Sequence, residues 1–206
     1  MTVPLVLVAA YLLGSIPIGY IVPRVVGGID IRTVGSGNPG FTNVYRAVGP
    51  RVALVVLLGD TGKGVLAILL ARSAGAGEVL VVLAGVAAIL GHVFTVFLRF
   101  RGGKGVLTAA GVFFSLIPAE TLLCLILFVA IVAATRFVSL GSIVAAAALP
   151  VLAYSLPRLR GGEISTPTFL LSLFAAAVIL IRHRSNLSRL LRGTESRFSF
   201  HRRNEP

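Results

Sequence analysis

Charged side chains are scarce in this sequence, at 13% of 206 residues, whereas hydrophobic residues make up 56%. Soluble globular domains carry about 25% charged residues. The mean hydropathy of +0.97 is also too high for a soluble domain of this length. These values exclude an ordinary soluble fold and predict that the lipid bilayer is the solvent.

Cysteine, tryptophan and acidic residues are also rare. The single cysteine, Cys124, lies in an apolar stretch, which excludes an intrachain disulfide and a thiolate metal cluster. The sequence has seven acidic residues and nineteen Lys and Arg residues, so its formal net charge is +12. The arginines occupy short loops and the C-terminal tail instead of one soluble face. We therefore expect contact with anionic lipid headgroups and no nucleic-acid partner.

Long apolar runs are what the sequence does contain. We predict an all-α polytopic membrane protein that forms one domain over residues 1–206, with a basic cytoplasmic tail from about residue 184. The first run has no basic region before it, so we interpret it as a span and not as a cleaved signal peptide. Pro118 and Glu120 predict a tight turn between two short helices. The seven expected spans are residues 3–23, 51–71, 79–98, 105–118, 119–135, 138–156 and 167–182.

The basic residues predict the orientation of these spans. With the first loop inside, about 15 of the 19 Lys and Arg residues face the cytoplasm, and only Arg72, Arg158 and Arg160 lie outside. Lys63 falls within the second span, where Asp60 predicts an intramembrane ion pair that fixes helix packing. We therefore expect the N-terminus outside and the C-terminus in the cytoplasm.

The longest inside loop has the residue types of a phosphate cradle. Glycines allow close backbone approach, hydroxyl and amide groups form hydrogen bonds, and an arginine provides a planar charged fork. A loop rich in Gly, Asn and Pro is also typical of a simple turn. The candidate binding residues are Ser36, Gly37, Asn38, Gly40, Thr42, Asn43 and Arg46.

The next inside loop concentrates glycine and basic residues at the start of a predicted helix. The N-terminus of a helix favours an anion. The pattern is not a Walker A motif, because Leu98 replaces its first glycine and Gly105 replaces its Ser/Thr, so ATP hydrolysis is disfavoured. The candidates here are His92, Arg101, Gly102, Gly103, Lys104 and Gly105.

Two further polar segments reach the same side of the predicted bundle. Ser139 and Ser142 open the sixth span, as helix caps or as ligand donors. His183 and Asn186 follow the last span, where Arg182 and Arg184 also fit a positive-inside anchor. Seven spans bring all four segments to the cytoplasmic interface, where one site for two phosphate-bearing molecules becomes feasible.

These segments resemble the acyl-phosphate:glycerol-3-phosphate acyltransferases of bacterial phospholipid synthesis. The resemblance extends from the first span to the tail and implies a seven-helix fold whose inside loops form the active site. Phe41 departs from the pattern, which usually has a small residue there. By this resemblance, the phosphate of glycerol 3-phosphate binds Ser36, Arg46 and Lys104, and the glycerol end binds Ser142, His183 and Asn186. The glycines around Lys104 receive the acyl phosphate.

The same resemblance implies a multi-pass enzyme of the bacterial inner membrane that makes lysophosphatidic acid and phosphate without a cofactor or metal. Its partners would be glycerol 3-phosphate, a long-chain acyl phosphate, membrane lipids and a soluble enzyme that produces the acyl phosphate. We expect Lys104 and backbone amides to face the developing oxyanion. His92 would accept the hydroxyl proton or orient a substrate.

Two alternatives belong to other classes of protein. A transporter for an organic phosphate would also need basic and glycine-rich segments, but it would place its charges near mid-membrane. Here only Asp60, Lys63 and Glu120 are deep in predicted spans. A purely structural membrane subunit explains the hydropathy and not the clustered glycine and lysine. The His-x4-Asp motif of other acyltransferases is absent, because Phe97 stands five residues after His92.

Overall fold

The computed structural model describes residues 2–199, and all regular structure in this part of the chain is helical. Phe200, Arg202 and Arg203, which belong to the expected basic tail, lie outside the described residues. The elements are α1 (Val3–Ser15), α2 (Ile18–Gly27), η1 (Ile31–Thr33), α3 (Phe41–Ala47), α4 (Pro50–Ser73), α5 (Glu78–Val93), η2 (Val96–Leu98), α6 (Val106–Leu116), α7 (Pro118–Thr135), α8 (Val138–Leu159), α9 (Thr166–Arg182) and α10 (Arg184–Leu191).

Five segments of the described chain are long and apolar enough to cross a membrane: Val3–Gly27, Pro50–Ser73, Glu78–Leu98, Pro118–Thr135 and Val138–Leu159. The count rises to six if α9 and α10, which are bent by 58°, form one broken span. The predicted all-helical membrane fold is therefore confirmed. Helix α6 has only 11 residues, so the expected count of seven stays a prediction.

The first predicted span is divided into two helices. Pro17 lacks a backbone N–H and interrupts the chain between α1 and α2. Buried side chains satisfy the carbonyl groups that the break releases: Lys63 Nζ donates to Ile16 O at 3.0 Å, and Thr95 Oγ1 donates to Ser15 O at 2.5 Å. Such internal partners allow a helix to break inside a membrane.

Pro118 begins a helix as expected. Helix α6 ends at Leu116, and α7 begins at Pro118, where the missing N–H costs nothing because first-turn N–H groups have no intrahelical acceptor. The two helices therefore meet at a tight turn. The sequence had predicted this turn from Pro118 and Glu120.

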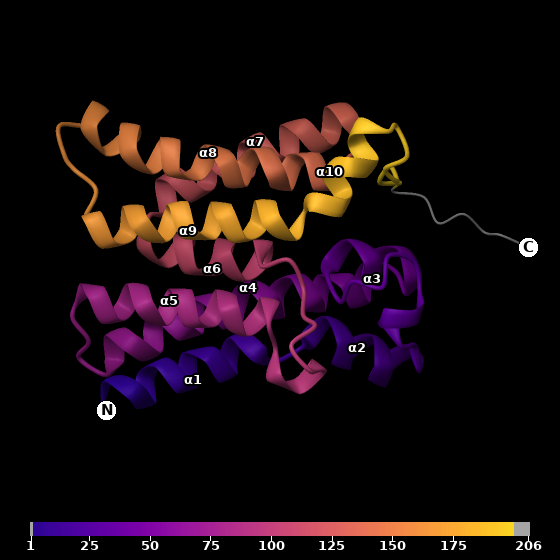
Figure 1. Cartoon of the computed structure of the whole chain (residues 1–206), viewed down its shortest axis with the longest axis horizontal. Helices are drawn as coiled ribbons and strands as arrows, with labels where there is room; N and C mark the ends of the chain where they lie inside the picture. Colours follow the sequence, from indigo (N-terminus) through magenta and orange to yellow (C-terminus); the bar gives the residue numbers. More distant parts are fainter. Residues whose placement is uncertain (1, 200–206) are drawn as a thin grey trace, which may run out of the picture.

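The helices form two groups with α6 between them (Figure 1). Helix α1 packs on α5, α4 packs on α6, and α8 packs on both α7 and α9. Glycines allow these close approaches: a Cβ at Gly14 or Gly91 would collide with the opposite backbone of the α1–α5 pair, and one at Gly64 or Gly111 with that of the α4–α6 pair. Small residues at crossing points are typical of membrane helix packing.

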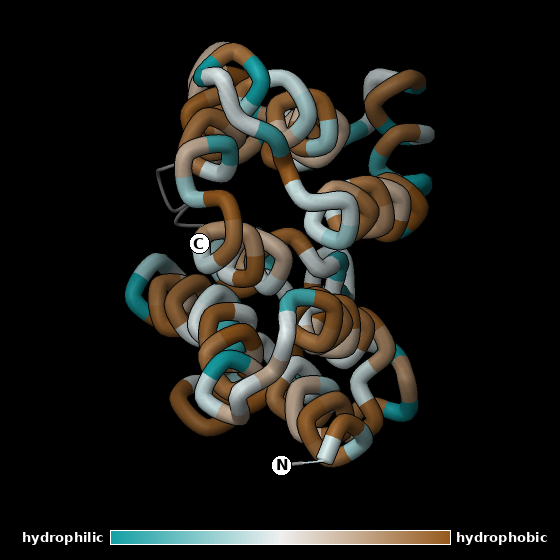
Figure 2. Tube along the Cα trace, turned by 90° about the vertical axis from the view of Figure 1, so that its left-hand side faces the viewer, coloured by the Kyte–Doolittle hydropathy of each residue, from teal (hydrophilic) through white to brown (hydrophobic). Residues whose placement is uncertain are grey.

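The polar segments gather at one end of the bundle. Helices α2, α3 and α10 lie at the same end in Figure 1, together with the loop that precedes α6. In Figure 2 the hydrophobic colour mostly follows the helices, and the hydrophilic colour lies mainly in the connecting segments. The fold thus places the candidate site at one end of an apolar bundle.

Candidate active site

The first polar loop is organised by Asn43. Its Oδ1 accepts from the backbone N–H of Ser36 at 3.1 Å, and its Nδ2 donates to the carbonyls of Ile31 and Val34 at 3.2 and 2.9 Å. The buried amide group therefore holds its own loop together, and its expected role in substrate binding stays a prediction. Ser36, Gly37, Asn38 and Gly40 lie in the turn before α3, and Thr42 and Arg46 lie on α3.

The second loop folds back onto the end of α5. The N–H groups of Gly102 and Gly103 donate to Val93 O and His92 O at 3.0 and 3.1 Å. These two amides therefore cap the end of α5, and the expected contact between backbone amides and the oxyanion stays a prediction. The adjoining α6 begins after Gly105, which has a φ of 88°, and no side chain caps this helix. The first-turn N–H groups, which have no intrahelical acceptor in any α-helix, are therefore not bonded by a capping side chain.

Lys104 extends from this loop to the C-terminal helix. Its Nζ donates to Asn186 Oδ1 at 2.5 Å, and Asn186 Nδ2 donates to Glu195 Oε1 at 2.6 Å. The same carboxylate accepts from Ser139 Oγ at 2.6 Å and from Arg189 Nε at 2.7 Å. Residues that are far apart in the sequence therefore share one hydrogen-bonded cluster.

The cluster is electropositive. Burial, opposed by Glu195 and reinforced by Arg189, Arg182 and Arg46, lowers the pKa of Lys104 to about 8. The pKa of Glu195 is itself lowered, since the hydrogen bonds from Ser139, Asn186 and Arg189 outweigh its burial. A carboxylate held among these cations demonstrates that the site accommodates an anion.

The segment after α10 connects this cluster to the first loop. Arg46 donates to the backbone carbonyls of Ser196 and Arg197 at 3.1 and 3.4 Å. Phe198 is buried, and its ring centroid lies 4.7 Å from that of Tyr45. Tyr45 also packs on Phe41, the residue that departs from the family pattern, at 5.9 Å. The bulky Phe41 therefore belongs to an aromatic row that secures the C-terminal segment.

The remaining predicted residues differ in how they are placed. Ser142 is buried and donates to Val138 O at 2.9 Å within α8, and neither Ser142 nor Ser139 caps that helix. His183 is buried, and its Nδ1 lies 2.8 Å from Ile179 O. Arg101 is exposed. Arg182, which we had interpreted as an anchor, donates to Gly102 O at 3.1 Å and so supports the second loop.

His92 lies behind the second loop, where only 8% of the residue is exposed. Its Nδ1 is 3.7 Å from Asp60 Oδ1, and its Nε2 side packs against Gly103. The structure thus brings His92 next to the second loop. This burial favours the orienting role over proton abstraction.

Sequence analysis missed Glu195 and Arg189 as members of the cluster. Glu195 is one of only seven acidic residues and follows a run of arginines, which was the available signal. Arg189 could not be distinguished from the other arginines of the tail, because its role depends on how α10 bends away from α9.

The family model for glycerol-3-phosphate acyltransferase matches residues 4–193 of this chain. The chain belongs to the glycerol-3-phosphate acyltransferase family. The glycerol-3-phosphate acyltransferase of Geobacter sulfurreducens is 47% identical over 190 residues, which cover 92% of this chain and 94% of that protein. The one from Synechococcus sp. is 49% identical over 193 residues and covers 94% of each chain.

Solved structures agree with this assignment. The glycerol 3-phosphate form of PlsY, an integral membrane glycerol 3-phosphate acyltransferase, superposes with a TM-score of 0.87 at 37% identity and covers 96% of both chains. Its lysophosphatidic acid form gives a TM-score of 0.85 at 36% identity. The family resemblance and the acyltransferase class predicted from the sequence are therefore confirmed.

In this glycerol-3-phosphate acyltransferase, Gly103 should tolerate no side chain. A Cβ there would overlap the imidazole of His92. We expect Gly103→Ala to lower kcat/KM for glycerol 3-phosphate by about 100-fold, since a displacement of about 1 Å in an active site has effects of this size. Steady-state kinetics in detergent or nanodiscs would measure it.

Gly62→Ala is the matched control, because a Cβ at Gly62 meets nothing within 4 Å. It should retain wild-type kinetics. Equal kinetics for Gly103→Ala and Gly62→Ala would show that the loop does not depend on this close contact.

Proposed function

We propose that this enzyme transfers an acyl group from a long-chain acyl phosphate to the 1-hydroxyl of glycerol 3-phosphate, giving lysophosphatidic acid and phosphate as the first step of phospholipid synthesis. The supporting observation is the cluster of Lys104, Asn186, Glu195, Ser139 and Arg189. It combines two partly buried cations, Lys104 and Arg189, with hydrogen-bond donors near the N-terminus of α6 and beside apolar helices. Such a site suits phosphate groups attached to an acyl chain or to glycerol.

The chemical step needs little covalent participation by the protein. The 1-hydroxyl oxygen bonds to the carbonyl carbon of the mixed anhydride, the bond from that carbon to the phosphate oxygen breaks, and the hydroxyl proton goes to the released phosphate or to water. Phosphate is already a good leaving group. The protein therefore contributes proximity and charge stabilisation, with Lys104 and the first turn of α6 near the charge that develops.

The same geometry supports the phosphate-binding roles that the family resemblance implies. Arg46 and Lys104 share one electropositive region, and Ser36 lies in the loop that Asn43 holds. We propose that these three residues bind the phosphate of glycerol 3-phosphate. Ser142, His183 and Asn186 would then contact the glycerol end, and Gly105 with the start of α6 would receive the acyl phosphate.

A reconstituted assay tests this function against phosphate transport. Purified protein is incubated with labelled glycerol 3-phosphate and palmitoyl phosphate, and lysophosphatidic acid is measured. The same protein in sealed vesicles is tested for uptake of labelled glycerol 3-phosphate without a donor. Product formation supports the acyltransferase. Uptake without product would refute it.

The titration of Lys104 predicts the pH dependence. Its pKa is lowered to about 8, so the ammonium group that binds phosphate is charged below pH 8 and is lost as the pH rises through that value. We expect kcat/KM for glycerol 3-phosphate, which reports the free enzyme, to fall above about pH 8.

Measuring kcat/KM from about pH 6.5 to about pH 10 for wild type and for Lys104→Arg tests this fall at alkaline pH. The guanidinium stays charged over the whole range, so the variant should be slower but should lose the alkaline fall near pH 8. The same alkaline fall of kcat/KM in both proteins would assign that fall to another titrating group.

We also propose seven crossings, with α6 as a short crossing, the N-terminus outside and the active site at the cytoplasmic face of the bacterial inner membrane. The distribution of Lys and Arg supports this orientation. A reporter fused after Arg203 should be cytoplasmic, and one fused before Val3 should be outside. Reporters on the same side would contradict seven crossings, because only an odd number separates the termini.

A further inference from the structure

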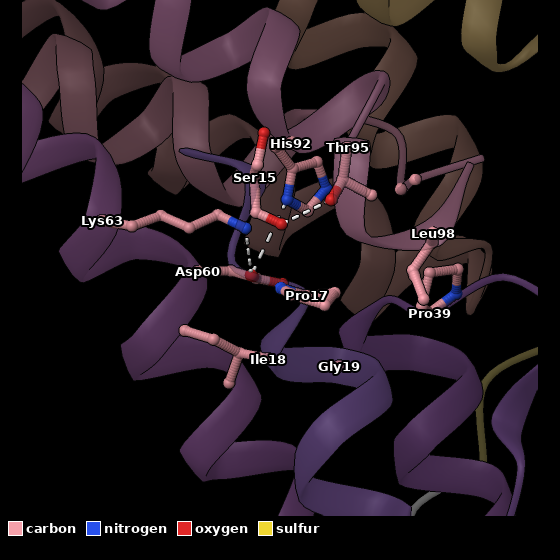
Figure 3. Close-up of a pocket in the computed structure, with 12 residues that line it drawn as sticks. Ser15, Pro17, Ile18, Gly19, Pro39, Asp60, Lys63, His92, Thr95 and Leu98 are labelled. Carbon is pink, nitrogen blue, oxygen red and sulfur yellow. Dashed lines mark hydrogen bonds and ion pairs between the residues drawn. The ribbon is translucent and has the colours of Figure 1, made fainter. Parts of the chain in front are cut away.

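Three ionisable side chains meet inside the bundle (Figure 3). Asp60 and Lys63 come from α4, and His92 comes from the end of α5. Asp60 Oδ1 lies 2.8 Å from Lys63 Nζ and 3.7 Å from His92 Nδ1. The three residues are 1%, 4% and 8% exposed. Charged groups buried this deeply in a membrane protein generally have a function.

Lys63 has a structural explanation of its own. It donates to Ile16 O at the break between α1 and α2, and Asp60 neutralises its charge. This ion pair, which the sequence predicted, requires no histidine. The third member, His92, therefore needs a separate explanation.

His92 forms the support of the glycine loop. Its ring lies against Gly103, so that even a Cβ on this glycine would overlap it. The backbone carbonyl of His92 accepts a hydrogen bond from the N–H of Gly103. Lys104 directly follows Gly103 in the sequence. A cavity of about 10 Å³ is lined by Asp60, Lys63, His92 and Gly103 among others. The cavity has about the volume that one water molecule requires.

We propose that Asp60 is a positioning residue for acyl transfer, which acts through His92. Asp60 fixes the imidazole, the imidazole fixes the Gly102–Gly103 turn, and this turn fixes the origin of the Lys104 side chain. The 3.7 Å separation is longer than a direct hydrogen bond, so the coupling is electrostatic or passes through one water. The inference rests on the proposed acyl transfer and adds a residue that lies outside the phosphate cluster.

The test must separate positioning from the ion pair. Asp60→Asn alone would leave Lys63 buried without a counter-charge, which is strongly destabilising. The double variant Asp60→Asn/Lys63→Met removes both charges. The effect of this double variant on kcat is measured in two backgrounds, one with His92 and one with His92→Asn. Asp30→Asn, which removes the acidic partner of the Asp30–Arg32 ion pair, is the control for loss of an ion pair elsewhere.

We expect the double variant to lower kcat by about 10- to 100-fold in the His92 background, because small displacements at a reacting centre have large effects. In the His92→Asn background the same change should lower kcat by less than about 3-fold, because the imidazole through which Asp60 acts is absent. Equal losses in both backgrounds, or full activity of the double variant with His92 present, would overturn the proposal.

A spectroscopic measurement makes the result independent of the donor. The chain has three histidines, so ¹⁵N-histidine labelling gives a simple spectrum. The ring-nitrogen signals of His92 should shift in Asp60→Asn/Lys63→Met, while those of His183 should stay. Unchanged His92 signals would overturn the proposal. Failure of wild type to use acyl phosphate would leave this spectral result unaffected and would refute only the proposed function.

Discussion

Lys104→Ala should lower kcat/KM by about 100- to 1,000-fold, the largest effect that we expect from one side chain. Removal of one group that stabilises a developing oxyanion costs about 2.7–4 kcal/mol in other enzymes. Lys104 also joins the second loop to Asn186 on α10, so its loss would weaken the contact between the two. Steady-state kinetics with both substrates varied would measure the effect.

The variant should stay folded, because Lys104 is only partly buried and lies outside the apolar core. Lys104→Arg should restore activity only in part, since a planar guanidinium cannot replace a compact ammonium group next to glycines. A well-folded Lys104→Ala enzyme with normal turnover and normal KM would contradict the role assigned to this residue.

Arg46→Ala should increase the KM for glycerol 3-phosphate by about 10- to 100-fold. Hydrogen bonds to charged groups contribute about 1.5–3 kcal/mol. We expect Arg46 to bond the phosphate of glycerol 3-phosphate in the bound state as well as in the transition state. Arg46 also holds the carbonyls of Ser196 and Arg197. The value of kcat should change less than KM.

Arg51→Ala provides the matched control. Arg51 is exposed, as Arg46 is, and lies close to it in the sequence at the start of α4. A general loss of surface charge would affect both variants equally. Similar KM values for Arg46→Ala and Arg51→Ala would therefore reject a specific phosphate contact for Arg46.

Hydropathy and proline predicted most of the fold. The turn at Pro118 and the starts of α4 and α8 follow from local sequence, because apolar length and helix-breaking residues act locally. The break at Pro17 was missed, since its stability depends on Lys63 and Thr95, which lie far along the chain. Long-range hydrogen bonds of this kind leave little local pattern.

The candidate site was predictable to a similar degree. Lys104, Asn186 and Ser139 were selected from the sequence, and they occur in one cluster. Their connection through Glu195 was not foreseen, because it requires the chain after α10 to fold back. Asn43 was selected as a substrate-binding residue, and its structural role, donating to two carbonyls of its own loop, was not predicted. Polar residue type alone cannot distinguish these two uses.

A competition between donors tests the central claim most directly. The purified enzyme receives unlabelled glycerol 3-phosphate with equal concentrations of palmitoyl phosphate that carries a ¹³C-labelled chain and unlabelled palmitoyl-CoA or palmitoyl acyl carrier protein. Mass spectrometry of the lysophosphatidic acid identifies the chain that was transferred. We predict that nearly all product carries the ¹³C chain. Comparable amounts of labelled and unlabelled product would contradict the assignment of acyl phosphate as the donor.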